Sequence, residues 1–483
     1  MGHGASRRVF LRNAAGGGLG LVVLANSGSV RGAPANSKLN VGLVGVGGRG
    51  SWFVDTLPRM ENVVAFCDVN DQKIGDAFRH CAKRAVDYAK SPNAWEKNAV
   101  PSYARITEDK VRVFHDFRKM LDEMGSGIDA VVVATPDHTH AVASAAAIRA
   151  GKAVFCEKPL TRAVGESRAL RELARKHKVA TAMGNQGTYS GAFRRALELI
   201  RNGTLGDIKE LHVWNSGGGS DKKEPPKGDM PVPEGFHWDL WLGPAAARPF
   251  HKDWLQRNAW RDFGTCQLGN WASHTANLAV MSMRVHELWL DEKPPDPHPL
   301  VRIHAKTTGI NRLSFPKWEL ITWEIPARGS LPPTAITWYN GATPGRKELV
   351  SAIHNEISDP KERKLEFAGT YIVGTKGRLY ATGHNATFGL LPEEPFKDVQ
   401  RTRPEEVEGS RGPEQDWFAA ARGGKPPWSS FDYADALNEF LMLGNVATQF
   451  EGTLEFDPVE CKIMNNEEAD KLLRPEYREG WTL

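Results

Sequence analysis

The stretch "VGLVGVGGRG" at residues 41–50 decides the fold of the first part of the chain. Its first half is an apolar run typical of a buried strand, and a G-x-G-x-x-G pattern follows. Glycines there allow a tight turn and let backbone amides approach a pyrophosphate at a helix N-terminus. The pattern therefore predicts a dinucleotide-binding strand, turn and helix, with contacts from Gly45, Gly47, Gly48, Arg49 and Gly50.

A second apolar strand ends in an acidic residue. The run "VVAFCDVN" at 63–70 places Asp68 at the carboxyl end of this strand. A carboxylate there can accept hydrogen bonds from both hydroxyls of an adenosine ribose, whereas a 2′-phosphate would meet like charge. NAD is therefore favoured over NADP, although Arg49 softens that preference. Alternatively, Asp68 caps the helix that follows the strand.

Strands and helices alternate through the first third of the chain. "IDAVVVATPDHTHA" at 128–141 and "AVFCEKPLT" at 153–161 each begin as a buried strand and end in polar residues. This alternation predicts a Rossmann domain over residues 38–182, with a doubly wound parallel sheet and ligands beyond the carboxyl ends of its strands. The long polar stretch between 71 and 113 is expected to be decoration or a subunit contact.

Several motifs occur in an order that is typical of one family. "GVGGRG", "ATPDHTH" and "CEKP" are followed by "GNQGTYSGAFRRALELIRNGTLGDIKELHVW" at 184–214 and "WRDFGTCQLGNWASH" at 260–274. With these motifs the chain resembles the glucose-fructose oxidoreductase, inositol dehydrogenase and MocA (Gfo/Idh/MocA) family. The resemblance implies an NAD(P)-dependent oxidoreductase that transfers a hydride from a sugar, polyol or glycoside hydroxyl. Together with the export signal expected at residues 1–35, it predicts a cofactor that is tightly bound and recycled, because free NAD is scarce outside the cytoplasm.

The resemblance also implies roles for individual residues. Lys158, before a cis bond to Pro159, would stabilise developing alkoxide charge, and His274 would take the hydroxyl proton with an unshifted pKa near ~6.5. Further implied cofactor contacts are Thr135, Pro136, His140, Glu157, Lys158, Asn185 and Gln186. For His140, packing at a helix start is the alternative. The implied substrate contacts are Lys158, Trp260, Arg261, Asn270 and His274.

The segment "QLGNWASHTAN" at 267–277 departs from the family pattern. Asn270 and Asn277 stand where family members commonly have acids, and on a helix they would share a face with His274. An amide can orient an imidazole but cannot hold its cation by charge. Asn270 is therefore placed in the catalytic group with two alternatives open. One is a carbohydrate-binding or assembly protein without dehydrogenase chemistry, and the other is an NAD-retaining lyase or glycosidase that acts through a keto-sugar.

The second part of the chain, residues 183–483, is expected to bind substrate and to oligomerise. The resemblance implies an α+β domain with a large, open, mostly antiparallel sheet, and alternating strand-like runs lie at 208–214, 301–308, 318–325, 334–341 and 371–381. Trp238, Trp241, Trp254 and Trp260 would either stack on sugars or anchor a loop. The open sheet face favours a homodimer or homotetramer.

Residues 1–35 resemble a twin-arginine signal. "SRRVFLR" precedes an uncharged, glycine-rich run and the sequence "APA", a pattern that predicts cleavage and export to the periplasm. A disordered tail or a membrane anchor is the alternative. Four arginines and no acid lie here, so the net charge of +4 disappears with this segment. No basic stripe then indicates a nucleic-acid partner.

Composition predicts a soluble globular protein. The 483 residues are 41% hydrophobic and 25% charged, and their number favours two lobes. No stretch after the signal has the continuous apolar length of a membrane helix. Five cysteines without CxxC spacing predict neither a disulfide framework nor a structural metal site. Cys67 and Cys156 lie in apolar runs and are expected to be buried.

Overall fold

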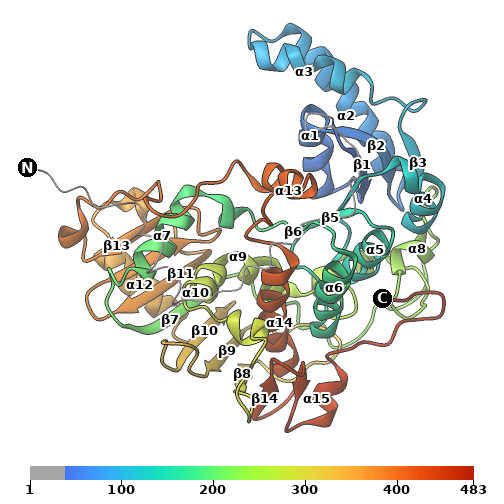
Figure 1. Cartoon of the computed structure of the whole chain (residues 1–483). Coiled ribbons are helices and arrows are strands. Elements are labelled where there is room, and N and C mark those ends of the chain that lie inside the picture. The colour runs from blue at the N-terminus through green and yellow to red at the C-terminus, as the bar shows by residue number, and fades with distance from the viewer. Residues whose placement is uncertain (1–37) are drawn as a thin grey trace, which may run out of the picture.

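The computed structural model describes residues 38–483, which form two sheets with helices packed against them (Figure 1). The first sheet is parallel and the second is mixed and mostly antiparallel, which confirms the α/β fold expected from the sequence. The predicted export signal at 1–35 lies outside the described residues. Within residues 38–483, none of the helices combines the length and the apolarity that a membrane crossing requires.

The first sheet has the strand order β3-β2-β1-β4-β5-β6, with every neighbouring pair parallel. Its strands are β1 Asn40–Val44, β2 Asn62–Cys67, β3 Arg112–Phe114, β4 Ala130–Val133, β5 Ala153–Cys156 and β6 Thr181–Met183. The strand order reverses between β1 and β4. Such a reversal opens a crevice at the carboxyl ends of the two strands, where ligands bind in this architecture.

Helices cover both faces of the first sheet. Val131 and Val133 of β4 pack into one core, whereas Ala130 and Val132 pack into another, so alternate residues are buried on opposite faces. The helices are α1 Gly50–Met60, α2 Asp71–Lys90, α3 Ala94–Ala104, α4 Phe117–Met124, α5 Asp137–Arg149 and α6 Val164–His177. α2 and α3 project from the sheet at the top of Figure 1. We call this sheet and its helices the first lobe.

The second sheet has nine strands in the order β13-β12-β11-β7-β10-β9-β8-β14-β15. They are β7 Ile208–Asn215, β8 Val301–Thr307, β9 Glu319–Ile325, β10 Thr334–Asn340, β11 Ala368–Gly374, β12 Arg378–Thr382, β13 Phe388–Leu391, β14 Thr453–Asp457 and β15 Lys462–Ile463. The run expected at 371–381 is not one strand. It is a hairpin of β11 and β12, because the Gly374 amide bonds the Gly377 carbonyl at 2.9 Å and turns the chain.

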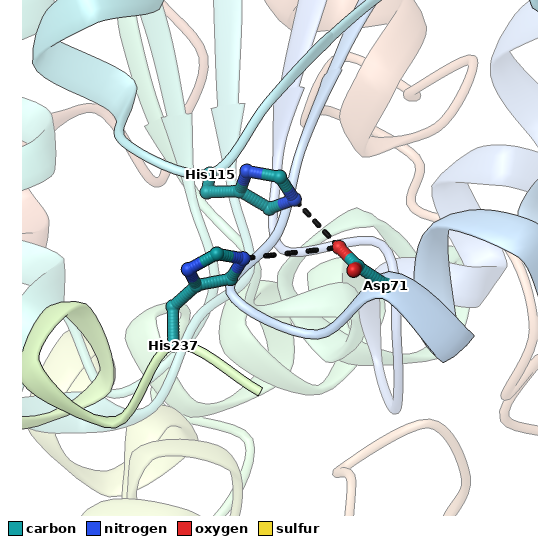
Figure 2. A group of neighbouring side chains, drawn as sticks. All are labelled: Asp71, His115 and His237. Carbon is teal, nitrogen blue, oxygen red and sulfur yellow. Dashed lines mark hydrogen bonds and ion pairs between the residues drawn. The ribbon is translucent and has the colours of Figure 1, made fainter. Parts of the chain in front are cut away.

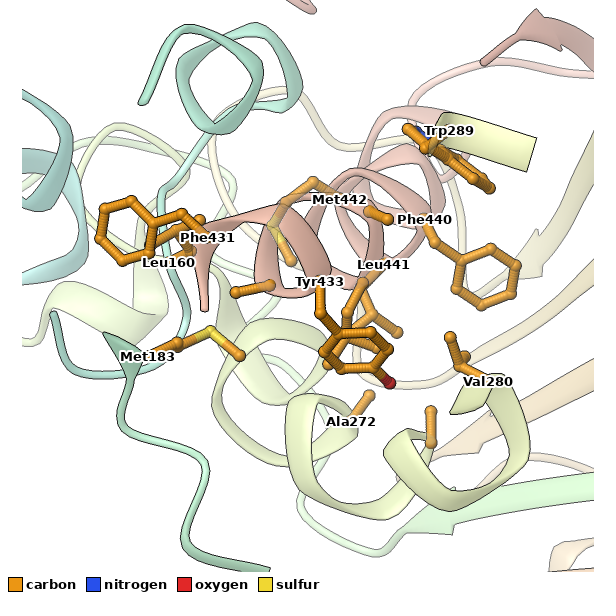
Figure 3. Close-up of a cluster of buried hydrophobic side chains, with 14 of the residues drawn as sticks. Leu160, Met183, Ala272, Val280, Trp289, Phe431, Tyr433, Phe440, Leu441 and Met442 are labelled. Atoms are coloured by element: carbon orange, nitrogen blue, oxygen red, sulfur yellow. The ribbon is translucent and has the colours of Figure 1, made fainter. Parts of the chain in front are cut away.

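The helices of the second lobe include one that joins the two lobes. They are α7 Gly191–Arg201, α8 Trp238–Leu242, α9 Ser273–Thr275, α10 Asn277–Ser282, α11 Glu287–Leu290, α12 Arg346–Glu356, α13 Pro413–Ala421, α14 Phe431–Ala447 and α15 Glu467–Lys471. Figure 3 shows α14 between the lobes: Phe431 lies beside Leu160 of the first lobe, and Tyr433 lies near Ala272 of the second. α14 thus binds both lobes into one core.

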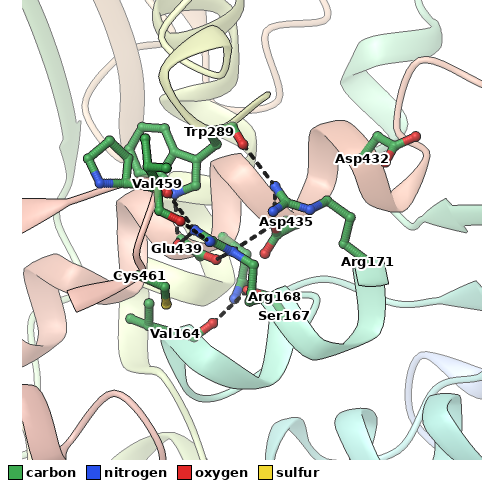
Figure 4. Close-up of polar contacts among 12 residues, drawn as sticks. Val164, Ser167, Arg168, Arg171, Trp289, Asp432, Asp435, Glu439, Val459 and Cys461 are labelled. Atoms are coloured by element: carbon green, nitrogen blue, oxygen red, sulfur yellow. Dashed lines mark hydrogen bonds and ion pairs between the residues drawn. The ribbon is translucent and has the colours of Figure 1, made fainter. Parts of the chain in front are cut away.

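Polar groups reinforce this junction. Arg168 of α6 donates to both carboxylate oxygens of Glu439 on α14, at 2.7 and 3.0 Å, as Figure 4 shows. α13 also returns to the first lobe, where Trp417 packs against Phe155 of β5. All five cysteines are buried and free, and Cys67 and Cys156 end β2 and β5 as buried side chains, as expected.

Candidate active site

The glycine loop between β1 and α1 is closed by two contacts that leave no room for a side chain. Gly45 has a φ of +84°, and a Cβ there would lie 2.7 Å from the Ala134 carbonyl oxygen. A Cβ on Gly50 would lie 2.0 Å from the carbonyl oxygen of Gly45. The loop therefore packs against the end of β4 and delivers the N-terminus of α1, which begins at Gly50, to the edge of the sheet.

Asp68 supports this loop from the end of β2. Its Oδ2 accepts hydrogen bonds from the amides of Val46 and Gly47 at 2.9 and 3.3 Å, and its Oδ1 accepts one from Asn70. Burial raises the pKa of Asp68, while these amides oppose the shift. The helix cap belongs to Asn70 instead, whose side chain accepts from the Gln72 amide. Asp68 thus stabilises the glycine loop, and it also lines the adjoining cavity.

A cavity of about 600 Å³ opens at the switch point between β1 and β4. Most of the residues implied by the sequence line it: Gly45, Gly47, Gly48, Arg49, Asp68, Thr135, Pro136, His140, Glu157, Lys158 and Asn270. Further lining residues that the sequence did not indicate include Lys73, His115, Asp137, Phe236 and Arg257. The cavity is thus surrounded by three strand ends, a glycine loop and a helix N-terminus. This arrangement fits a bound dinucleotide.

Two ion pairs frame the cavity. Arg49 donates its Nε to the buried carboxylate of Glu157 at 2.7 Å, which ties the glycine loop to the end of β5. Across the cavity, Arg257 of the second lobe pairs with buried Asp137, and the Thr265 hydroxyl donates to the same carboxylate at 2.7 Å. Burial raises the pKa of Asp137, but the charges of Arg257, His140 and Lys158 and the Thr265 hydrogen bond together outweigh burial, so the pKa is lowered. Both buried carboxylates are thus held in place by arginine side chains.

His140 connects the segments that follow β4 and β5. Its Nδ1 lies 2.8 Å from the Pro159 carbonyl and its Nε2 lies 2.8 Å from the Thr135 carbonyl. Burial lowers the pKa of this imidazole, but neighbouring Cys156 and Asp137 raise it to about 9. Only an imidazolium can donate to both carbonyls. His140 lines the cavity, and its hydrogen bonds position the segments that carry Thr135 and Pro159.

Lys158 follows β5 and precedes a cis peptide bond to Pro159, as expected. Its Nζ donates to the side-chain oxygen of Asn270 at 2.6 Å and to the backbone carbonyl of the same residue at 3.1 Å. Burial lowers the pKa of Lys158, and the charges of Arg257 and Arg49 lower it further against the opposing Glu157 and Asp137. Asn270 is therefore a partner of Lys158, and its side chain does not bond His274.

His274 is oriented by Asn185. The Asn185 amide nitrogen donates to the Ser273 carbonyl at 2.6 Å, so its Oδ1 accepts from Nδ1 of His274 at 3.1 Å. This bond fixes the proton on Nδ1 and leaves Nε2 as a lone-pair acceptor. The expected unshifted pKa is wrong: burial, then the charges of Lys158 and His384, hold the pKa of His274 well below its usual value.

The segment around His274 does not place its three polar residues on one helical face. Residues Leu268–Ala272 form a π-helical turn before α9, which changes the spacing that a continuous α-helix would give. Asn277 is fully buried, where it donates to the Thr188 hydroxyl at 2.8 Å and accepts from the Tyr433 hydroxyl at 2.6 Å. Asn277 is therefore a buried core residue, and its side chain bonds these two hydroxyls.

Trp260 and Arg261, the implied substrate contacts, do not line the cavity. The Trp260 indole donates to the Asp253 carbonyl at 2.7 Å inside a buried aromatic cluster that also holds Trp238 and Trp254. Arg261 is buried, and burial lowers its pKa to about 10. Its guanidinium donates to the carbonyls of Asn311, Ser314 and Asn445 and to the Thr448 hydroxyl. Trp260 and Arg261 thus anchor loops. Of the four tryptophans that the sequence suggested for stacking on sugars, only Trp241 lines the cavity.

An aromatic surface that the sequence reasoning missed lies beside His274. The ring of His384 is 4.7 Å from that of His274, and Trp271 packs 5.1 Å from His384 and 4.8 Å from Phe367. Phe367 is 50% exposed, His384 is exposed and Trp271 is half-buried. Gln186, expected near the cofactor, does not line the cavity and keeps a buried Oε1 without a hydrogen-bond partner among the described residues.

Comparison with known proteins supports the reading of the first lobe. Residues 39–185 match the Gfo/Idh/MocA family described as "Oxidoreductase family, NAD-binding Rossmann fold". An uncharacterised oxidoreductase of Schizosaccharomyces pombe is 34% identical over 120 residues, which cover 24% of this chain and 32% of that protein. The match thus spans about a third of that relative.

Two weaker likenesses extend further. A glycosyl hydrolase family 109 protein of Stenotrophomonas maltophilia is 22% identical over 396 residues, or 76% of this chain and 73% of that protein. The solved structure of a levoglucosan dehydrogenase in complex with NADH and L-sorbose has a TM-score of 0.52 at 17% identity, covering 87% of this chain and 99% of the other. That likeness concerns the fold. The first lobe of this chain therefore matches the NAD-binding Rossmann fold of the Gfo/Idh/MocA oxidoreductases.

Proposed function

We propose that the protein is an NAD-dependent oxidoreductase that oxidises a hydroxyl of a sugar, polyol or glycoside. One observation carries the proposal: beyond the glycine loop, a lysine ammonium lines the cavity and its charge acts on a neutral imidazole with a free Nε2. When bound, NAD accepts the hydride. Lys158 donates a hydrogen bond to the reacting oxygen, and His274 Nε2 takes its proton.

Carbohydrate as the substrate class is supported by the aromatic surface of Trp271, Phe367 and His384. Aromatic rings stack on the apolar faces of sugars, and this surface adjoins the proposed base. The solved levoglucosan dehydrogenase, similar in fold, is in complex with NADH and L-sorbose. The substrate is therefore expected to present a pyranose or furanose ring with its hydroxyl toward Lys158.

The test follows the absorbance of bound nicotinamide while the purified protein meets a panel of sugars, polyols and glycosides. Reduction by at least one compound, abolished in His274→Ala while NAD remains bound, is the expected result. If sugars bind without reducing the cofactor, the protein is a carbohydrate-binding family member and the proposal fails.

A second candidate is redox-neutral glycoside cleavage, in which the cofactor is reduced and reoxidised. Two observations favour it: the family 109 glycosyl hydrolase aligns with 76% of this chain, and Asn270 stands where an acid is common. An aryl glycoside separates the two functions. Release of the phenol without accumulation of reduced nicotinamide indicates cleavage, and accumulation without phenol release indicates dehydrogenation.

We also propose export through the twin-arginine pathway and a homodimer or homotetramer. Export of a folded protein would carry NAD across with it, which fits a recycled cofactor. Replacement of Arg7 and Arg8 by lysine should retain the protein in the cytoplasm. Light scattering of the mature protein measures the oligomeric state, and a monomer at working concentration would contradict the second part.

A further inference from the structure

Three potential metal-binding side chains meet at the edge of the cavity, and the proposed reaction uses none of them. Asp71 begins α2, His115 follows β3, and His237 precedes α8 of the second lobe. Their ligand atoms all lie within 4.8 Å of one another. Figure 2 shows both imidazoles directing Nε2 at the same Asp71 oxygen, at 2.6 Å from His115 and 3.9 Å from His237.

One nitrogen of this group makes no hydrogen bond with the described residues. His115 pairs with Asp71, but Nε2 of His237 is buried and has no hydrogen bond among the described residues. Its ring lies against that of His115, with 3.9 Å between centroids. A buried nitrogen that makes no hydrogen bond costs free energy unless another group satisfies it. A cation between the three groups would do so.

The donor set selects the class of cation. Two imidazole nitrogens and a carboxylate oxygen suit Zn²⁺ and similar first-row ions, whereas Mg²⁺ and Ca²⁺ prefer oxygen ligands. Zinc bonds of about 2.0–2.2 Å place tetrahedral ligand atoms roughly 3.4 Å apart. The side chains of Asp71, His115 and His237 are 56%, 35% and 40% exposed. They can therefore rotate by the small amount required, and an ion can reach them.

We propose that Asp71, His115 and His237 bind one Zn²⁺-class ion that fastens the second lobe to the first. The backbone already brings these segments together: the Asp71 amide bonds the Gly235 carbonyl at 2.9 Å, and the His237 amide bonds the Val69 carbonyl at 2.8 Å. Neighbouring Asn70 and Phe236 line the cavity together with His115. The ion would hold this edge of the cavity closed; the further effect, slower loss of dinucleotide, rests on the proposed function.

The experiment begins with the mature protein stripped by a chelator, without nucleotide. Zinc is titrated calorimetrically and counted per chain after desalting, and Co²⁺ replaces it to report coordination by its visible spectrum. We expect one ion per chain, a higher melting temperature with zinc, and affinity at least about tenfold lower in His115→Ala and His237→Ala. Asp71→Asn, which keeps the size of the side chain, should weaken binding too.

His298→Ala is the matched control, because His298 pairs with Asp457 at 2.9 Å outside this three-residue group. Its zinc affinity should equal that of the parent. Absence of zinc binding, or equal affinity in the parent and His237→Ala, would overturn the proposal. The rate of NAD release with and without zinc is measured separately. Normal NAD binding in a protein that takes no zinc would reject the metal site and leave the oxidoreductase proposal standing.

Discussion

Positively charged side chains have very different partners in two regions of this protein, the junction of α6 and α14 and the candidate active site. At the junction of α6 and α14, Arg168 forms a two-bond pair with Glu439, and Arg171 lies 2.8 Å from Asp435 (Figure 4). Burial, together with the charge of Glu439, raises the pKa of Asp435 well above its usual value. In the candidate active site, by contrast, the hydrogen bonds of the Lys158 ammonium within residues 38–483 go to neutral oxygens of Asn270.

The difference separates groups that hold the fold from groups kept available for chemistry. The Glu439 carboxylate also accepts from the Trp289 indole at 2.7 Å, so it gains a third donor. The candidate site instead leaves an ammonium facing an amide, an imidazole with a free Nε2 and an exposed aromatic ring. Such incompletely paired groups cluster where ligands bind, because a ligand completes them.

The largest expected effect is on stability, from Glu439→Gln. Loss of this charge leaves Arg168 buried opposite a neutral amide, and breaking a buried pair costs about 3–5 kcal/mol. Denaturant unfolding should show a drop in the free energy of unfolding of that order, while turnover per folded molecule is unchanged. Asp432→Asn is the control, because its pair with Arg175 joins the same helices at the surface and should contribute at most about 1 kcal/mol. Equal losses in the two variants would contradict this view of the junction.

Lys158→Met should show the opposite pattern. Loss of a positioned donor lowers turnover by about 100- to 1000-fold, whereas the free energy of unfolding should change by less than about 1 kcal/mol because a poorly paired ammonium is removed. Steady-state kinetics on the best substrate and denaturant unfolding measure the two quantities. A variant that turns over normally, or that unfolds as easily as Glu439→Gln, would remove the contrast between the sites.

The sequence predicted the groups that lie in continuous motifs and missed those assembled by the fold. Gly45, Asp68 and Lys158 follow buried strands. The alternation of strands and helices therefore places all three at the carboxyl ends of the strands of one parallel sheet. The partners of the two proposed catalytic residues are 112 positions away for Lys158 and 89 for His274. Asn270 lies in a π-helical turn and bonds Lys158, a partner that no periodicity reveals. Arg261 illustrates the reverse case: its motif suggested substrate, but carbonyl groups from distant loops surround it.

Asn270→Asp should move the pH dependence of Lys158. A carboxylate at the position of the present amide favours the charged ammonium and raises the lysine pKa, by about one unit or more for such close pairs. The ammonium is the active form, so activity falls as pH rises through this pKa, and the alkaline limb should shift upward by that amount. Asn277→Asp is the control, because Asn277 contacts Thr188 and Tyr433 instead. Superimposable alkaline limbs for the parent and Asn270→Asp would mean that residue 270 does not tune the lysine.

The smallest effect should come from Phe367→Ser on the aromatic surface. The ring is half exposed beside Trp271, so its loss should leave the fold and turnover intact and remove only stacking on the substrate. Aromatic contacts of this kind contribute about 0.5–1.5 kcal/mol, which corresponds to a two- to tenfold rise in KM at unchanged kcat. Trp95→Ser, which removes a 53% exposed ring on α3, should leave KM unaltered. If both variants leave KM unchanged, the exposed ring of Phe367 is not a substrate contact. Lys158 and His274 would then be the groups of the candidate active site that still differ from the ion-paired groups of the α6–α14 junction.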